Sequence, residues 1–354
     1  MPDERSVSQG PHDEPLDRMS RAWTLPLLLL LFVGSGCPAL IYQIVWLQSL
    51  QLIIGSSAVS LGVLLGTFMG GMCLGSLLLP RLISPARHPL RVYAVLELGI
   101  GFFGIVLLFV LPHASRVYAS FVGPGWAGVL IRGLVCALGL LAPTVFMGAT
   151  LPAIARWVRA TPKGVSWLGF FYGGNTAGAV LGCLLAGFYL LRVYDMAVAT
   201  YVAAAINLAV ASLALLLAGY TSNRTLEDGP AAEMRESERL ALHSLRPPSG
   251  GRSTIYVVIA LSGLCALGAE VVWTHVLSLL LGGTVYTFSI ILAVFLTGLG
   301  IGSGLGSMIA REMVRPHLAL GGCQLLLVGA IAWAAYGLAE SLPYWPVDPS
   351  LSRS

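Results

Sequence analysis

Long apolar runs alternate with short polar segments along most of the chain. Nine runs reach about 20 residues or more, the length that an α-helix needs to cross the hydrocarbon core of a bilayer. They cover residues 24–48, 54–79, 92–112, 126–152, 166–191, 196–219, 254–281, 284–310 and 317–340. Because lipid cannot hydrogen-bond to the backbone, continuous apolar runs predict helices, and they lack the alternation of barrel strands. The pattern predicts an all-α polytopic membrane protein with about nine transmembrane helices.

Polar segments divide these runs into two sets. Six runs lie within 23–219 and three within 254–340, so we expect a six-helix membrane half followed by a partial second half. A charged segment, 220–253, is expected to form a cytosolic linker between them. Residues 1–22 are polar and mixed in charge, which is typical of a disordered cytosolic tail. Residues 341–354 are expected to form a tail on the outer side, and we expect the chain to be part of a longer protein.

Two stretches of 42 residues, Ser35–Ser76 and Ser262–Ser303, align without a gap at an offset of 227 positions. Fourteen aligned positions are identical, and they include Gly, Trp, Phe and Ser as well as aliphatic residues. Apolar composition alone would mostly align one aliphatic residue with another. The alignment predicts an internal duplication in which both copies have the same orientation. Two positions that are 227 residues apart are called paired positions below.

Composition and charge exclude an ordinary soluble domain. The chain is 56% hydrophobic and 10% charged, whereas soluble domains carry about 25% charged residues. Of the 20 Lys and Arg residues, 16 lie in the N-terminal tail and in alternate loops. By the positive-inside rule this distribution predicts a cytoplasmic N-terminus. The net charge of +4 therefore reflects membrane topology, and we expect the lipid bilayer, and no nucleic acid, as a partner.

Polar side chains inside the apolar runs are the best candidates for a site, because such groups are costly in lipid. Gln43 is paired with Glu270, and Glu97 is paired with Gln324. Each half therefore carries one acid and one amide at equivalent places. One interpretation is two polar layers that line a path for a ligand, with the two acids binding a cation or proton. The other is a set of hydrogen bonds that only hold helices together.

Other residues have weaker signals. Trp46 and Trp273 lie three positions after the first polar pair and could line the same path or anchor the helices at the membrane interface. Asn175, in the sequence GGNTAG, is more typical of a close helix crossing than of a ligand site. Glycines at short spacing in two runs predict helix-packing surfaces: Gly62, Gly66, Gly70, Gly71 and Gly75 in the first, and Gly298, Gly300, Gly302, Gly304 and Gly306 in the second.

Cysteine and histidine show no spacing that is typical of a metal site. The six cysteines all fall inside apolar runs without a CxxC motif, which favours packing thiols. No Ser–His–Asp arrangement or pair of carboxyl groups suggests catalysis. The sequence therefore predicts no catalytic residue, no metal and no cofactor in this chain.

Several motifs together resemble the membrane region of bacterial fused MFS/spermidine-synthase proteins. They are SGCPALIYQIVWLQSLQLIIGSS (35–57), HPLRVYAVLELGIG (88–101), GATLPAIARWV (148–158) and FYGGNTAGAVLGCLLAGFYLL (171–191). The resemblance implies an MFS-like arrangement of parallel six-helix halves in the bacterial inner membrane. It also implies a C-terminal domain similar to polyamine aminopropyltransferases. Such a domain needs a glycine-rich loop after a strand, and this chain has none.

Three functions fit these observations. The chain could be the non-catalytic membrane module of such a fusion, which anchors the enzyme or passes a polyamine-type substrate. It could instead be a free-standing MFS-like secondary transporter of a small cation. It could also be a structural membrane scaffold without a ligand. The resemblance favours the first function, and carboxyl groups along a path would suit a polyamine.

Overall fold

The computed structural model describes residues 15–55, 57–84, 87–119, 126–159, 164–220, 250–312 and 316–341. Within these ranges the regular elements are helices, and no strand occurs. In chain order they are α1 (Pro15–Ile54), α2 (Ser57–Leu82), α3 (Pro89–Ala119), α4 (Trp126–Arg159), α5 (Gly164–Leu184), the π-helix η1 (Leu185–Leu190), α6 (Leu191–Val193), α7 (Met196–Tyr220), α9 (Gly250–Leu281), α10 (Val285–Glu312), α11 (Pro316–Tyr336) and the π-helix η2 (Gly337–Ser341).

Nine spans in the described ranges are long and apolar enough to cross a bilayer, as the sequence predicts. Elements α5, η1 and α6 together supply the fifth span, Tyr172–Val193. The described residues therefore form an all-α, multi-pass membrane protein. The linker and tail predictions for residues 1–14, 221–249 and 342–354 lie outside the described residues.

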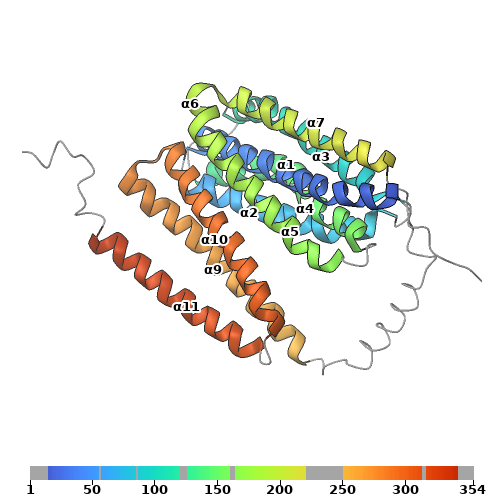
Figure 1. Cartoon of the computed structure of the whole chain (residues 1–354). Helices are drawn as coiled ribbons and strands as arrows, with labels where there is room; N and C mark the ends of the chain where they lie inside the picture. The colour runs from blue at the N-terminus through green and yellow to red at the C-terminus, as the bar shows by residue number, and fades with distance from the viewer. Residues whose placement is uncertain are drawn as a thin grey trace, which may run out of the picture.

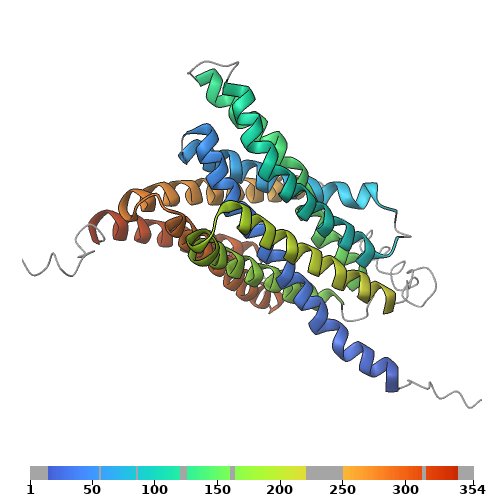
Figure 2. The same ribbon diagram turned by 90° about the horizontal axis from the view of Figure 1, so that it is seen from above.

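Helix α1 is longer at both ends than the sequence predicts. It begins at Pro15, so residues 15–22 of the expected tail are helical, and its N-terminal end projects beyond the neighbouring helices (Figure 2). Its other end extends from the expected residue 48 to Ile54. Hydropathy marks where a helix lies in lipid, but a helix can continue past that boundary until a residue ends it.

A glycine ends α1, and a glycine also ends α9. Gly55 has φ +82° and Gly282 has φ +89°, and they are the only described residues in this left-handed conformation. Glycine adopts it without the steric cost of a Cβ, and for that reason it commonly follows the last turn of a helix. The two positions are paired, so both sharp reversals occur at the same place in the alignment.

The first six spans form a bundle around α1 (Figure 1). Helix α1 packs along α5 and α7, α2 packs along α4, and α3 packs along α4 and α7. Small residues allow these close approaches. A Cβ on Gly75 would overlap the carbonyl oxygen of Val145 in α4, and one on Gly36 would overlap that of Asn175 in α5. The predicted crossing at GGNTAG is therefore present.

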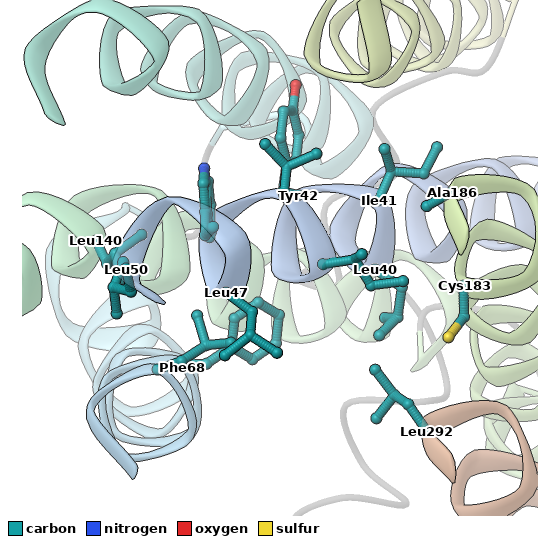
Figure 3. Packing of buried hydrophobic residues seen from close by; sticks show 14 of the residues in the cluster. Leu40, Ile41, Tyr42, Leu47, Leu50, Phe68, Leu140, Cys183, Ala186 and Leu292 are labelled. Carbon is teal, nitrogen blue, oxygen red and sulfur yellow. The ribbon is translucent and has the colours of Figure 1, made fainter. Parts of the chain in front are cut away.

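The middle of α1 provides much of the buried core. In Figure 3, Leu40 and Leu47 project from α1 toward Leu292 of α10 and Phe68 of α2, respectively, and Cys183 of α5 lies in the same cluster. Lipid tails are as apolar as these side chains, so close van der Waals packing, and not the exclusion of water, stabilises such contacts in a membrane.

Helices α9, α10 and α11 lie beside this bundle as a much more open set (Figure 1). Helix α10 packs against α5 and η1, and α9 contacts α2. In the most apolar 18-residue stretch of each helix, 11% of the residues are buried in α9, 22% in α10 and 0% in α11. The corresponding values in the first six spans are 28–67%.

The glycine prediction holds for only part of each series. Gly71 and Gly75 contact α4, whereas Gly62, Gly66 and Gly70 face open space. In α10, Gly300 approaches Thr176, but at the other four glycines an added Cβ would meet no atom within 4 Å. Spacing along one helix therefore does not show which face meets another helix.

Candidate functional site

A pocket of about 350 Å³ lies between the two sets of helices, at the end of the bundle where α1 meets α2 and α9 meets α10. This volume is within the range of small-molecule sites, about 300–1,000 Å³. Its lining mixes apolar side chains with amide, hydroxyl and imidazole groups. The lining residues are Ile44, Leu47, Gln48, Gln51, Ala58, Leu61, Val271, Thr274, His275, Ser278, Gly283, Thr284, Val285, Tyr286 and Phe288.

Most of this lining consists of paired positions. Twelve of the fifteen residues form six pairs at the 227-residue offset. Two of these pairs combine a residue of α1 with a more polar or ionisable residue of α9: Leu47 with Thr274, and Gln48 with His275. The same places in the two sets of helices thus face each other across one pocket, and the second set contributes more of the hydrogen-bonding groups.

The hydroxyl group of Thr274 is a buried polar group in this lining that lacks a hydrogen bond to the described residues. Its side chain is 7% exposed, and its Oγ1 atom is buried without a hydrogen-bond partner in the part of the chain that the structure describes. A buried hydroxyl without a partner costs about 1–3 kcal/mol. Such an atom in a pocket wall indicates a place where a bound molecule could complete the hydrogen bonding.

The connection between α9 and α10 is held in place by its own hydrogen bonds. The Thr284 hydroxyl accepts a hydrogen bond of 3.3 Å from the backbone N–H of Thr287, as in an N-terminal helix cap. The Thr287 hydroxyl donates a bond of 2.8 Å to the Gly282 carbonyl oxygen. This part of the pocket rim is therefore built from satisfied groups, unlike Thr274.

Glu270 lies one helical turn from Thr274 on α9, on the same side of the helix. Its side chain is 3% exposed, and it has no hydrogen-bond or ion-pair partner among the described residues. It does not line the pocket itself, but Val271 and Thr274 on the same side do. Gln43, its paired residue, is also buried, at 2% exposed. An acid and an amide thus lie one turn deeper than the pocket wall.

Glu97 is in a different environment, inside the first six helices. The Ser35 hydroxyl donates a hydrogen bond of 2.5 Å to one carboxyl oxygen, and the Asn207 amide donates one of 2.7 Å to the other. Asn207 in turn accepts a bond of 3.1 Å from the Tyr42 hydroxyl. The network joins α1, α3 and α7, and Glu97 is fully buried. Its contacts are those of a group that holds helices together.

Gln324 lies on α11, outside the bundle, and is partly buried. Its Nε2 atom donates a hydrogen bond of 3.3 Å to the Ser262 hydroxyl of α9. Ser262 is paired with Ser35, and Gln324 is paired with Glu97. The two hydrogen bonds therefore join the same paired positions. Glu97 and Gln324, the second of the two predicted polar layers, have different surroundings, because Glu97 lies inside the first six helices and Gln324 lies on α11.

The remaining candidates are Trp46, Trp273 and Asn175, and two of them make packing contacts. Trp46 is 2% exposed, and its ring stacks on that of Tyr42 at a centroid distance of 5.3 Å. This burial does not fit a residue that anchors the helix at the interface. Trp273 is partly buried. Asn175 is partly buried, and its backbone carbonyl lies against Gly36, so the close crossing accounts for its position.

Sequence reasoning missed Thr274, Gln48, Gln51 and His275 as pocket residues. A threonine in an apolar run usually donates a hydrogen bond to the backbone of its own helix. The sequence around Thr274 therefore does not indicate that its hydroxyl lines a pocket. The alignment did contain one signal, because Thr274 takes the place of Leu47 and His275 takes the place of Gln48 within the aligned stretch. Comparisons with family models, curated proteins and solved structures give no match.

Proposed function

We propose that this chain is a membrane module that binds a small organic cation between its two sets of helices, as part of a path across the membrane. The pocket lined by paired positions supports this proposal most directly, because ligand sites of duplicated transporters lie where the repeats meet. The volume and mixed lining suit a molecule with an apolar chain and polar ends.

Glu270 is the group that we propose binds the cation. A carboxyl group in a membrane span is costly unless it has a partner or a function, and this one has no partner among the described residues. A ligand in the pocket could place one amino group beside Thr274 and extend a second toward Glu270, one turn deeper. By contrast, both carboxyl oxygens of Glu97 already accept hydrogen bonds, so we assign Glu97 a structural role.

A polyamine is the first ligand that we propose. It carries ammonium groups separated by methylene chains, which matches hydroxyl and carboxyl groups in an otherwise apolar lining. The resemblance to the membrane region of fused MFS/spermidine-synthase proteins leads to the same ligand class. We further propose that the chain resides in the bacterial inner membrane with its N-terminus in the cytoplasm, which places the pocket at the outer side.

Spermidine binding to the purified full chain in lipid nanodiscs tests this function. We expect saturable binding, and we expect Glu270→Gln to weaken it at least tenfold while the melting temperature changes little. Gln fits this position sterically because its paired residue is Gln43. Glu340→Gln, which neutralises an exposed carboxyl group in η2, is the matched control and should bind normally. A folded Glu270→Gln chain with unchanged affinity, or a wild-type chain that does not bind spermidine, would contradict the proposal.

A further inference from the structure

Helix α9 buries polar side chains and leaves apolar ones exposed. Among its described side chains, residues 256–281, only Glu270 and Thr274 are buried. Neither of them has a hydrogen-bond partner in the part of the chain that the structure describes. Helix packing in a membrane normally buries small residues, or polar residues that bond to a neighbouring helix. The buried strip of α9 therefore suits a polar occupant better than a packed helix.

Helix α1 places an amide at the equivalent position. Gln43, the paired residue of Glu270, is 2% exposed and has no hydrogen-bond partner among the described residues. It lies one turn before Leu47, as Glu270 lies one turn before Thr274, and residues one turn apart share a side of their helix. Leu47 and Thr274 both line the pocket. An amide on α1 and a carboxyl group on α9, both without partners, thus lie one turn deeper than the pocket wall.

The chemistry of this pair distinguishes between kinds of cation. An ammonium group with N–H donors can bond both to the Glu270 carboxylate and to the Gln43 amide oxygen, because both groups accept hydrogen bonds. A quaternary ammonium group has the same charge but no N–H. It would leave the buried amide oxygen without a partner, and such a group disfavours the complex. The charge of Glu270 alone would attract both kinds of cation.

We propose that Gln43 and Glu270 together hold one N–H-bearing ammonium group, so that the site accepts protonated amines and rejects quaternary ammonium ions. The inference rests on the proposed function, and it adds Gln43 as the residue that determines this specificity. It also explains why an acid is paired with an amide. Glu270 supplies the charge, whereas a second carboxylate at position 43 would add a further costly charge inside a span.

Binding of spermidine and of its fully N-methylated, quaternary analogue to the full chain in lipid nanodiscs tests this specificity. We expect the wild-type chain to bind spermidine at least about tenfold more tightly than the analogue, which has the same charge. Gln43→Leu should weaken spermidine binding about tenfold and leave binding of the analogue unchanged. The Gln43 amide has no partner among the described residues to lose, so leucine should not lower the melting temperature.

Gln324→Leu is the matched control, because it removes an amide of α11 that does not line the pocket. It should keep the preference of the wild-type chain for spermidine. If the quaternary analogue were rejected only because it is bulky, Gln43→Leu would also keep that preference, since leucine and glutamine have similar volumes. The Gln43→Leu result therefore separates hydrogen bonding from size.

An exchange of the two side chains tests whether they share one ligand. Glu270→Gln alone should weaken spermidine binding at least tenfold, as above. Adding Gln43→Glu returns one carboxyl group to the same site from the other helix. The doubly substituted chain should therefore bind spermidine within about threefold of the wild type, which is a coupling that two independent positions would not show.

Three results would overturn the inference and leave the proposed function standing. They are an unchanged preference in Gln43→Leu, a doubly substituted chain that folds but does not bind spermidine, and equal or tighter binding of the quaternary analogue by the wild type. The last result would assign recognition to the rings of Tyr286 and Phe288 in the lining, which attract a cation without needing N–H donors. A wild-type chain that binds neither ligand would instead contradict the proposed function, and this inference with it.

Discussion

The Ser35 hydroxyl donates a hydrogen bond of 2.5 Å to the Glu97 carboxyl group, across the contact between α1 and α3. At the positions 227 residues later, Gln324 donates a bond of 3.3 Å to Ser262, between α11 and α9. The direction of the bond reverses because an amide can donate, whereas a carboxylate only accepts. The serine hydroxyl can take either role, and thus one pair of positions accommodates both an acid and an amide.

This pair predicts that Glu97→Gln is tolerated. The glutamine can accept from Asn207 and donate to Ser35, as Gln324 donates to Ser262, so we expect a change in unfolding free energy of less than about 1 kcal/mol. Glu97→Leu leaves the buried Asn207 amide without its acceptor and should cost about 1–3 kcal/mol. Denaturant unfolding in detergent measures both. Equal stability of the two variants would show that the network does not hold α1, α3 and α7 together.

Thr274→Val should separate stability from binding. Valine has nearly the same shape, and the hydroxyl that it removes has no hydrogen-bond partner among the described residues, so the ligand-free chain should become more stable, by about 1 kcal/mol. Spermidine binding should weaken several-fold if the hydroxyl contacts the ligand. The control is Thr287→Val, which removes a hydroxyl that does donate a hydrogen bond, to Gly282, and should therefore destabilise the chain. If Thr274→Val is destabilising to the same extent, the Thr274 hydroxyl has a partner in the protein.

The two helix-ending glycines should be sensitive to alanine. Gly55→Ala and Gly282→Ala place a Cβ on left-handed backbone, and each should cost about 1–2 kcal/mol of unfolding free energy. Gly283→Ala is the control in the same connection, since Gly283 does not have a positive φ and has no close neighbour. Thermal melting of the three variants tests this expectation. A loss of stability that is no larger for Gly282→Ala than for Gly283→Ala would argue against a conformational requirement at Gly282.

Membrane orientation can be tested with single cysteines in a chain that lacks the six native ones. If the N-terminus is cytoplasmic, Gly283→Cys lies at the outer side beside the pocket, and an impermeant thiol reagent should label it in intact cells. Ser84→Cys, between α2 and α3, lies on the opposite side and should react only after the cells are opened. Labelling of Ser84→Cys from outside would reverse the orientation and place the pocket at the cytoplasmic side.

The sequence by itself determined the helices and their number among the described residues. Each span is predictable because lipid cannot satisfy a backbone, so that about 20 apolar residues in a row have to be helical whatever surrounds them. The alignment of Ser35–Ser76 with Ser262–Ser303 also pairs Gly55 with Gly282, and both glycines follow the last turn of a helix in the left-handed conformation. These are local properties that the identity of a few neighbouring residues decides.

Only the tertiary structure decided which polar groups have partners. Glu97 and Asn207 are 110 residues apart in the chain, and nothing local to either residue indicates that α3 and α7 bring them together. Glu270 has the same chemistry as Glu97, but it is buried on α9 without a partner among the described residues. The role of a buried carboxyl group depends on the neighbours that helix packing supplies, because only a neighbouring helix or a ligand can satisfy it in lipid.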